Sequence, residues 1–266
     1  MPSISKEAYP MDLSQLKALQ NKVAAARPLV HHITNFVTMY QCARITSVLG
    51  ASPIMAFAAE EACDVTSKAD SLVINTGTLN NTVIASIPKA LEAANRHNIP
   101  VVLDPVGLQL SDYRHDFILS LLEGFHFDVL RCNSAELLNI HNKVCLGSGI
   151  DCGRDTDITD VKQAAKAVAA RYDCTVACTG PTDIISYPEG TILLSRGSAL
   201  LPKLVGTGCM VNSLIGAFLP VSDSAAEAAE AGILTMCLAG EAAEDSLSSS
   251  DGIGTFEVKL LDFLNL

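Results

Sequence analysis

A short turn with two glycines, Gly206-Thr207-Gly208, leads directly into an apolar stretch with helical spacing. The first amides of a helix have no partner inside the helix and point outward, so this turn is suited to holding a phosphate or another anion. Cys209 lies at the mouth of the predicted helix, where no acid or histidine is present. Its thiol either takes part in chemistry beside the anion or ends the turn as a small buried hydrophobic group.

Two carboxylates stand where predicted strands end. Asp104 closes an apolar strand before Pro105, and it is either a turn-forming residue or a carboxylate near a metal–phosphate centre. Glu136 follows Asn133 by three residues across a strand-to-helix junction, which places both on one helical face. The same spacing is typical of a capping box, with Asn133 as the N-cap and Glu136 reaching back to it. The capping role is compatible with a water-mediated metal role.

A basic residue and a hydroxyl residue complete the set of strand ends. Arg131 lies in an apolar strand, where its charge needs a partner, either a structural ion pair or a nucleotide phosphate. Thr179-Gly180 closes the next strand and can place a hydroxyl and an amide at one point.

Two neighbouring histidines, His31 and His32, precede Thr34 and Asn35 at another strand-to-helix corner. Adjacent side chains of a strand point to opposite faces of the sheet. The pair therefore does not predict a metal site.

These residues must be positioned by alternating strands and helices. Near-continuous apolar strands between amphipathic helices predict a three-layer α/β fold with a mostly parallel central sheet and helices on both faces. Residues 183–197 alternate around Pro188-Glu189-Gly190, which predicts an antiparallel hairpin at the sheet edge. We expect one domain over residues 1–266, because no repeat or linker interrupts the pattern. The expected strands are 71–77, 99–107, 127–133 and 174–180, and the expected helices are 81–98 (interrupted by Pro88), 112–124, 134–142, 157–173, 208–219, 224–248 and 255–265.

In such sheets, ligands bind beyond the carboxyl ends of the strands. That rule selects the polar residues that close the predicted strands, namely residues 75–77, Asp104, residues 131–133 and residues 179–180.

Composition excludes several classes of partner. The net charge of −11 and the absence of a basic run argue against nucleic acid. No apolar run approaches the ~18 residues of a membrane-spanning helix, and the first residues lack a signal sequence. The nine cysteines are odd in number and contain no C-x2-C pair, so we expect free thiols in a reducing cytoplasm rather than disulfides or a zinc site.

The motifs, taken in order, resemble those of the hydroxyethylthiazole kinase family of the ribokinase-like superfamily. The resemblance covers about residues 28–260 and is carried by "PLVHHITNFVT", "LGASPIM", "VINTGTL", "VVLDPVG", the segment from Arg131 to Glu136, "CTG..D" and "VGTGC". It implies a ribokinase-like fold and phosphorylation of the primary alcohol of 4-methyl-5-(2-hydroxyethyl)thiazole in thiamine salvage, with ATP and Mg2+. It also implies a homotrimer with the thiazole site at the subunit interface.

The resemblance assigns residues to the two substrates. It implies that Met55 lines the thiazole pocket, that Asn35 and Gly77 lie near it, and that Gly208 lies against the substrate. For the nucleotide, it implies that Arg131 and Thr179 contact ATP.

The resemblance also assigns the reacting centre. Asp104 and Glu136 would bind Mg2+ through water molecules. The anion hole would consist of Gly206, Thr207 and Gly208. Cys209 occupies the position at which most ribokinase-like kinases place an aspartate base, so it is our candidate catalytic residue.

The chain departs from the family pattern mainly on the nucleotide side. The usual R-G-N-A-S-E is "RCNSAE", and if position 132 needs a positive φ, Cys132 costs ~1–2 kcal/mol. The usual V-T-G-E-x-D is "CTGPTD", with Pro181 in place of an acid, and "LQLSDYR" replaces a run of small residues after "DPVG". The usual H-C-I-T-N is "HHITN".

Three other functions stay open at this point. The first is another kinase of the same fold, such as a hydroxymethylpyrimidine kinase, against which Met55 argues. The second is a thiol enzyme with Cys209 as nucleophile, since a helix N-terminus lowers a thiol pKa. The third is a non-catalytic, ligand-binding trimer, which the altered nucleotide segments favour.

Overall fold

One mixed sheet organises the computed structural model, which describes residues 11–143 and 157–265. Its strands are β1 (Leu29–Ile33), β2 (Ser52–Ile54), β3 (Ser71–Asn75), β4 (Val101–Asp104), β5 (Val129–Asn133), β6 (Thr175–Thr179), β7 (Asp183–Tyr187) and β8 (Gly190–Leu194). They lie in the order β2-β1-β3-β4-β5-β6-β7-β8. Every pairing from β2 to β6 is parallel, whereas β6–β7 and β7–β8 are antiparallel.

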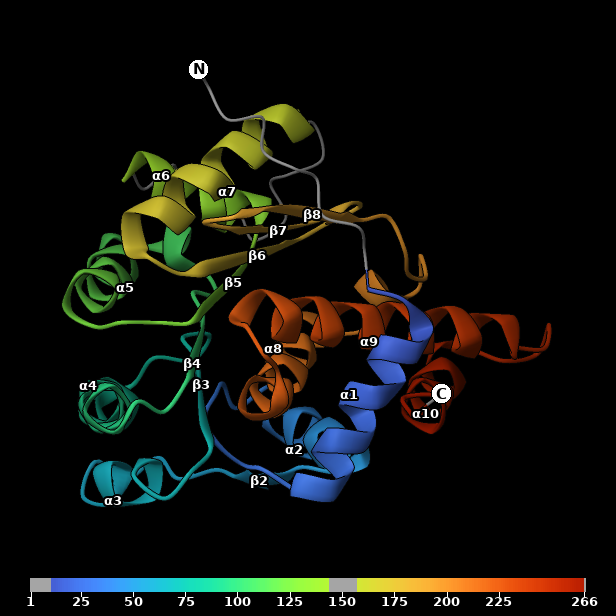
Figure 1. The fold of residues 1–266 in the computed structure, drawn as a ribbon, viewed down its shortest axis with the longest axis horizontal. Helices are drawn as coiled ribbons and strands as arrows, with labels where there is room; N and C mark the ends of the chain where they lie inside the picture. The colour runs from blue at the N-terminus through green and yellow to red at the C-terminus, as the bar shows by residue number, and fades with distance from the viewer. Residues whose placement is uncertain (1–10, 144–156, 266) are drawn as a thin grey trace.

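Helices cover both faces of this sheet (Figure 1). The helices α3 to α7 lie on one face, and α1, α2 and α8 to α10 lie on the other. Their bounds are α1 Leu13–Ala26, α2 Met39–Leu49, α3 Ala62–Thr66, α4 Asn81–His97, α5 Asp112–Gly124, α6 Ser134–Asn142, α7 Ile158–Tyr172, α8 Thr207–Phe218, α9 Ala225–Asp245 and α10 Ile253–Asp262; three short 3-10 helices are η1 Leu108–Leu110, η2 Leu201–Lys203 and η3 Leu219–Val221.

The strands send alternate side chains into two hydrophobic cores. In β3, Val73 packs into the core under α8 and α9, while Leu72 and Ile74 pack into the core under α4 and α5. This alternation explains why the strands read as continuous apolar runs, because both faces are covered. The predicted three-layer α/β fold is therefore confirmed.

The predicted hairpin is confirmed at the sheet edge. Tyr187 pairs with Gly190, so that only Pro188 and Glu189 form the turn between β7 and β8. The expected interruption at Pro88 is wrong, because α4 continues through this residue from Asn81 to His97. Residues 246–252 connect α9 with α10.

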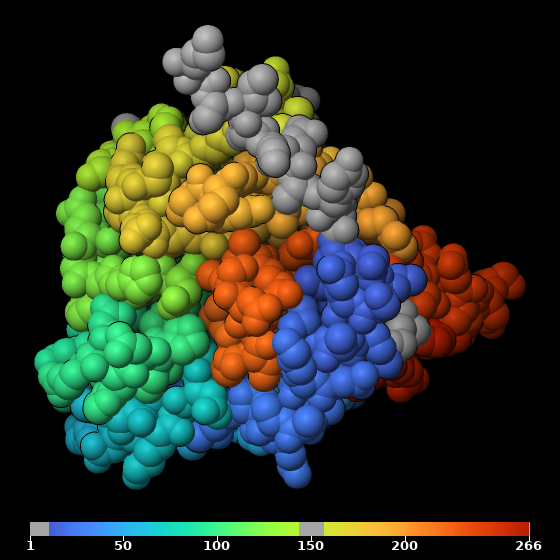
Figure 2. All heavy atoms as spheres, in the orientation of Figure 1, coloured from blue at the N-terminus to red at the C-terminus, as the bar shows by residue number. Residues whose placement is uncertain are grey.

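Helix α1 was not among the expected elements, although its start has a local signal. Asp12 accepts hydrogen bonds from the backbone of Ser14 and Gln15, and the Gln15 side chain accepts from the Asp12 amide at 2.9 Å. This capping box starts the helix. In Figure 2, α1 (blue) lies beside the start of α9 (orange-red) at the molecular surface, and buried residues of both helices belong to one core.

Some sequence predictions concern segments outside the described residues. The first ten residues and two cysteines, Cys145 and Cys152, lie there, so the single domain over 1–266 stays a prediction. The seven cysteines in the described ranges are all free. Among the described helices, none has the length and apolar character needed to cross a membrane.

Candidate active site

The predicted site residues meet at the carboxyl edge of the parallel strands. Asn75 at the end of β3 pairs with Asp104 at the end of β4. Asn133 at the end of β5 pairs with Thr179 at the end of β6. Helix α8 packs on β1, β3 and β4, and Cys209 in its first turn contacts Asn75 at this edge. Parallel pairing therefore brings together residues that are far apart in the sequence.

The glycine turn has the conformation that its sequence predicted. Gly206 caps α8 with φ +93°, a left-handed conformation that favours glycine, and Thr38 packs against it. A Cβ on Gly208 would lie 2.5 Å from Nη1 and 2.6 Å from Nη2 of Arg131. The missing side chain thus lets the guanidinium lie directly against the first turn of α8. Helix amides and an arginine at one point make a site for an anion.

Cys209 faces two side-chain amides. Its sulfur accepts from Nδ2 of Asn35 at 3.3 Å and from Nδ2 of Asn75 at 3.4 Å. Burial, together with the nearby charge of Asp104, raises the pKa of the Cys209 thiol to about 11. The thiol is therefore protonated at neutral pH. This contradicts the hypothesis of a thiolate nucleophile activated by the helix N-terminus.

Asp104 is fully buried and is held by two amides on one oxygen. Its Oδ2 accepts from Asn75 Nδ2 at 2.6 Å and from Asn212 Nδ2. Its Oδ1 lies 3.7 Å from Nη1 of Arg131 and accepts no hydrogen bond from the described residues. Burial raises the pKa of the Asp104 carboxyl, and the charge of Arg131 acts against that rise.

Arg131 of β5 contacts residues at the ends of both neighbouring strands, β4 and β6. Besides facing Asp104, its Nη2 donates to Oγ1 of Thr179 at the end of β6. Burial disfavours the guanidinium charge, but the carboxylates of Asp104 and Glu136 together raise the pKa of Arg131. The arginine therefore keeps its charge beside the glycine turn.

Glu136 combines the two roles that the sequence left open. The capping box is confirmed, because Asn133 Oδ1 accepts from the Glu136 amide and Glu136 Oε2 accepts from the Asn133 amide, both at 2.9 Å. Its other oxygen, Oε1, accepts from the Gly107 amide at 3.2 Å, which ties it to the loop after Asp104. Burial, followed by the charge of Asp104, raises the pKa of Glu136 to about 7.

Of the residues predicted to lie near the thiazole alcohol, two contact the site around Cys209 and one does not. Asn35 contacts both Asn75 and Cys209, and Gly77 lies against Asn35 with its amide bonded to Asn75 Oδ1. Met55 follows β2, two strands away from β3 in the sheet, and it is half-buried. No described polar contact links Met55 to Cys209.

One predicted donor is already engaged within the chain. The Gly180 amide donates to Asp183 Oδ1 at 3.0 Å, so in this structure it closes the turn after β6 instead of standing free. Burial raises the pKa of Asp183 to about 6. The hydroxyl of Thr179 contacts Arg131, so both of these strand-end groups have partners within the chain.

The departure at Cys132 causes no backbone strain. Cys132 lies within β5, and it is absent from the non-glycine residues with positive φ in the described ranges. Its side chain is buried opposite Cys178 of β6. The conditional cost of a positive φ therefore does not apply.

The neighbouring histidines point to opposite faces, as expected. His31 contacts Thr66 and the Ala56 carbonyl, and His32 contacts Ser213 and the Val30 carbonyl. Burial lowers the pKa of His32 to about 4, which keeps that ring neutral. Both histidines are structural.

Two site residues were not singled out from the sequence. Asn212 is a buried polar residue within the apolar stretch of α8, and that contrast was the available signal. Arg114 donates to the Thr76 carbonyl at 2.5 Å and to the Val106 carbonyl at 3.2 Å, so it joins the loops after β3 and β4. No local pattern distinguished Arg114 from a surface arginine.

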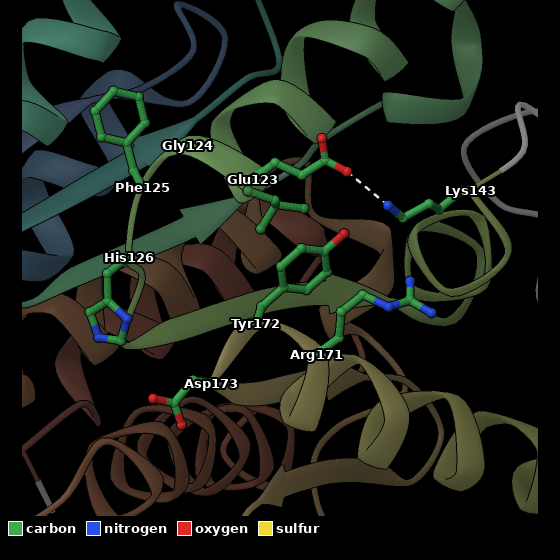
Figure 3. A pocket seen from close by; sticks show the side chains of 9 residues that line it. Glu123, Gly124, Phe125, His126, Lys143, Arg171, Tyr172 and Asp173 are labelled. Carbon is green, nitrogen blue, oxygen red and sulfur yellow. Dashed lines mark hydrogen bonds and ion pairs between the residues drawn. The ribbon is translucent and has the colours of Figure 1, made fainter.

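A separate hollow of about 500 Å³ lies at the opposite end of the strands (Figure 3). Its lining residues include Phe125 and His126 before β5, and Tyr172 and Asp173 before β6. An ion pair of 2.7 Å joins Lys143 and Glu123, both well exposed, across its upper part. It contains none of the predicted site residues, so we assign the active site to the carboxyl edge.

Comparisons with known proteins identify the family of this chain. The model of the hydroxyethylthiazole kinase family matches residues 20–266. A hydroxyethylthiazole kinase from Alkaliphilus metalliredigens is 42% identical over 258 residues, which is 96% of this chain and 93% of the relative. Another from Methanosarcina acetivorans is 37% identical over 241 residues, 90% of each chain.

Solved structures give the same result. The structure of a hydroxyethylthiazole kinase protein from Pyrococcus horikoshii OT3 has a TM-score of 0.83 and 36% identity, and covers 95% of this chain and 93% of that chain. A ribokinase-like superfamily protein from Enterococcus faecalis has a TM-score of 0.62 at 13% identity, covers 97% of this chain and 90% of that chain, and so supports the fold alone. These relatives give no support to the pyrimidine-kinase or non-catalytic alternatives. The family model matches most of this chain, and the hydroxyethylthiazole kinases named above are more than a third identical to it over most of their length. The chain therefore belongs to the hydroxyethylthiazole kinase family.

Proposed function

We propose that this protein transfers the γ-phosphoryl group of ATP to the primary alcohol of 4-methyl-5-(2-hydroxyethyl)thiazole. The observation that carries the proposal is the contact of Arg131 with Gly208, one residue before Cys209. It places a fixed positive charge and the first amides of α8 at one point, next to a group that can face an alcohol. Phosphoryl transfer depends mainly on such positioning and charge stabilisation.

The nucleotide binds on the β5–β6 side of the edge in this proposal. Arg131 and Thr179, which already contact each other, face the phosphates. The amides of Gly206, Thr207 and Gly208 hold the transferred group, where they stabilise the charge that develops on its oxygens. These donors are fixed by the fold before the substrate arrives, which is what makes such stabilisation effective.

The alcohol binds on the β1–β3 side. Asn35 contacts Cys209, Gly77 lies against Asn35, and Met55 supplies apolar contact for the thiazole ring. Gly208, next to Cys209, lies between the two substrates. A loose transition state leaves the attacking alcohol largely protonated, so the neutral thiol of Cys209 is sufficient to orient the hydroxyl.

Two buried carboxylates fit Mg2+ bound together with ATP. Magnesium keeps several waters and takes one or two carboxylates plus substrate phosphates, and no group of three or more His, Cys, Asp or Glu side chains suited to a metal occurs in the described ranges. Asp104 Oδ1 is buried and accepts no hydrogen bond within the described part of the chain, so it is the atom that fits this need best. Asp104 and Glu136 would hold the ion through water, and the ion would neutralise charge on the phosphates.

A homotrimer is the assembly that we propose. Phe36, Val37 and Tyr40 are 54%, 63% and 68% exposed beside the thiazole side, and Phe36 stacks edge-on to Phe57. These neighbouring apolar side chains support a subunit interface next to the site. Light scattering that shows a monomer with full activity at assay concentration would contradict it. The free cysteines of the described residues support the expected cytoplasmic compartment.

A coupled assay of ADP release tests the proposed reaction. Purified protein with ATP and Mg2+ is assayed with the thiazole alcohol, with hydroxymethylpyrimidine, and with no alcohol. We expect kcat/KM for the thiazole alcohol to exceed that for the pyrimidine by at least ~10²-fold, because a site built for one ring leaves polar groups unpaired with the other. Equal rates with both alcohols, or ADP release without an alcohol, would contradict the proposal.

A further inference from the structure

One face of α8 carries both Gly208 and Asn212. The two residues are four positions apart, so they lie on the same side of the helix. Asn212 is 1% exposed, in a helix whose other buried residues are mainly apolar. A buried amide at this position needs partners that compensate for its lost hydration.

The partner of Asn212 is Asp104. Asn212 Nδ2 donates to Asp104 Oδ2, and Asn75 Nδ2 donates to the same oxygen at 2.6 Å. Two amides on one oxygen fix the rotation of the carboxylate. The other oxygen, Oδ1, is thereby turned to Arg131, whose Nη1 lies 3.7 Å away.

The chain of contacts returns to its starting helix. Arg131 faces Asp104 with its Nη1 atom, and both Nη atoms occupy the space that a Cβ of Gly208 would need. Asn212 therefore holds Asp104, Asp104 faces Arg131, and Arg131 lies on the helix turn four residues before Asn212. The helix that carries the anion turn also sets the position of the arginine beside it.

We propose that Asn212 is a positioning residue for phosphoryl transfer, acting through Asp104 to hold Arg131 against Gly208. This inference rests on the proposed roles of Asp104 and Arg131. Without the Asn212 amide, Asn75 alone holds Oδ2, and the carboxylate is free to turn and draw the guanidinium away from the glycine turn. The loss of the Asn212 amide therefore weakens the binding of ATP and leaves the binding of the thiazole alcohol unchanged.

Asn212→Leu tests this role, because leucine has a similar size and no donor. Titration calorimetry with ATP in the absence of metal gives the first readout, and we expect Kd for ATP to rise about tenfold, the effect of one hydrogen bond to a charged group. The Kd for the thiazole alcohol should stay within about twofold, as expected for a site that does not share the interaction. Thr235→Val is the matched control, since it removes a buried hydroxyl of α9 that has no hydrogen-bond partner in the described part of the chain. If Asn212→Leu does not fold, Asn212→Ala, with its higher helix propensity, replaces it with the same expectations.

A double-mutant cycle with Asp104→Asn separates this inference from the proposed function. We expect Asp104→Asn to lower kcat/KM for ATP strongly and Asn212→Leu to add little in that background, because both changes act on one group. Strong loss with Asp104→Asn but unchanged ATP binding and turnover with Asn212→Leu would overturn the positioning role alone. Full activity of Asp104→Asn would overturn the proposed site and the inference with it. Equal weakening of ATP and thiazole binding by Asn212→Leu would also contradict the inference.

Discussion

Replacing Cys209 tests what a thiol does at the position beside the anion turn. The sulfur accepts hydrogen bonds from Asn35 and Asn75, and its pKa is about 11. Burial and the nearby charge of Asp104 therefore keep the thiol protonated at neutral pH. The thiol therefore acts as a neutral group that orients the alcohol.

The size of the effect follows from this protonation state. A neutral thiol orients the alcohol without taking its proton, so we expect Cys209→Ala to lower kcat about 10²-fold, the usual cost of a misplaced reacting group. Cys209→Asp places a carboxylate, a true acceptor, within reach of the two amides that now donate to sulfur. Those donors stabilise its charge against the nearby Asp104, so we expect activity to be kept or raised.

Steady-state kinetics with ATP and the thiazole alcohol provide the assay. Cys63→Ala is the matched control, because Cys63 is a half-buried free cysteine of α3, far from α8 in the sequence. Wild-type kcat for Cys209→Ala would remove the thiol from the mechanism. An inactive but folded Cys209→Asp would refute the interpretation of the two amides as a ready site for a carboxylate.

Three further changes test other parts of the site. Gly208→Ala forces Arg131 to move by about 1 Å, so we expect kcat/KM for ATP to fall ~10²-fold. Gly124→Ala is the control, because its added Cβ meets nothing and its kinetics should stay unchanged. Equal kinetics of the two variants would contradict the contact between Gly208 and Arg131. Asp183 has a raised folded-state pKa of about 6, so its contribution to stability is present below pH ~4 and is lost as the pH rises through 6. Urea unfolding should therefore show Asp183→Asn gaining up to ~3 kcal/mol relative to wild type between pH 4 and pH 7, and a difference independent of pH would disprove the assignment. Glu136→Gln should lower turnover and leave the calorimetric Kd of the thiazole alcohol nearly intact; lost thiazole affinity with normal turnover would be the opposite result.

Much of the fold was predictable because the local signals agree with the tertiary structure. Apolar strands such as β3 are buried on both faces, so a run like "SLVIN" indicates a covered parallel strand. The strand-end rule then placed Asp104, Arg131 and Thr179 at one edge, where the structure has them. The hairpin was predictable from a two-residue turn between alternating strands.

The rest depended on contacts between distant segments. Asn212 bonds to Asp104 across 108 residues, and Arg114 bonds to carbonyls of another loop, and neither has a signature in its own sequence. The Gly180 amide could be predicted as a strand-end donor, but its capture by Asp183 depends on the turn that follows. The continuation of α4 through Pro88 likewise shows that tertiary packing outweighed a local helix breaker.

Direct detection of the product tests the central claim most directly. Purified protein is incubated with ATP, Mg2+ and the thiazole alcohol, and the mixture is followed by phosphorus NMR and mass spectrometry. We predict a phosphate ester on the hydroxyethyl group, formed in equal amount to ADP, and formed about 10²-fold more slowly by folded Gly208→Ala. ATP turnover that yields inorganic phosphate without the ester, or an ester on hydroxymethylpyrimidine instead, would contradict the account.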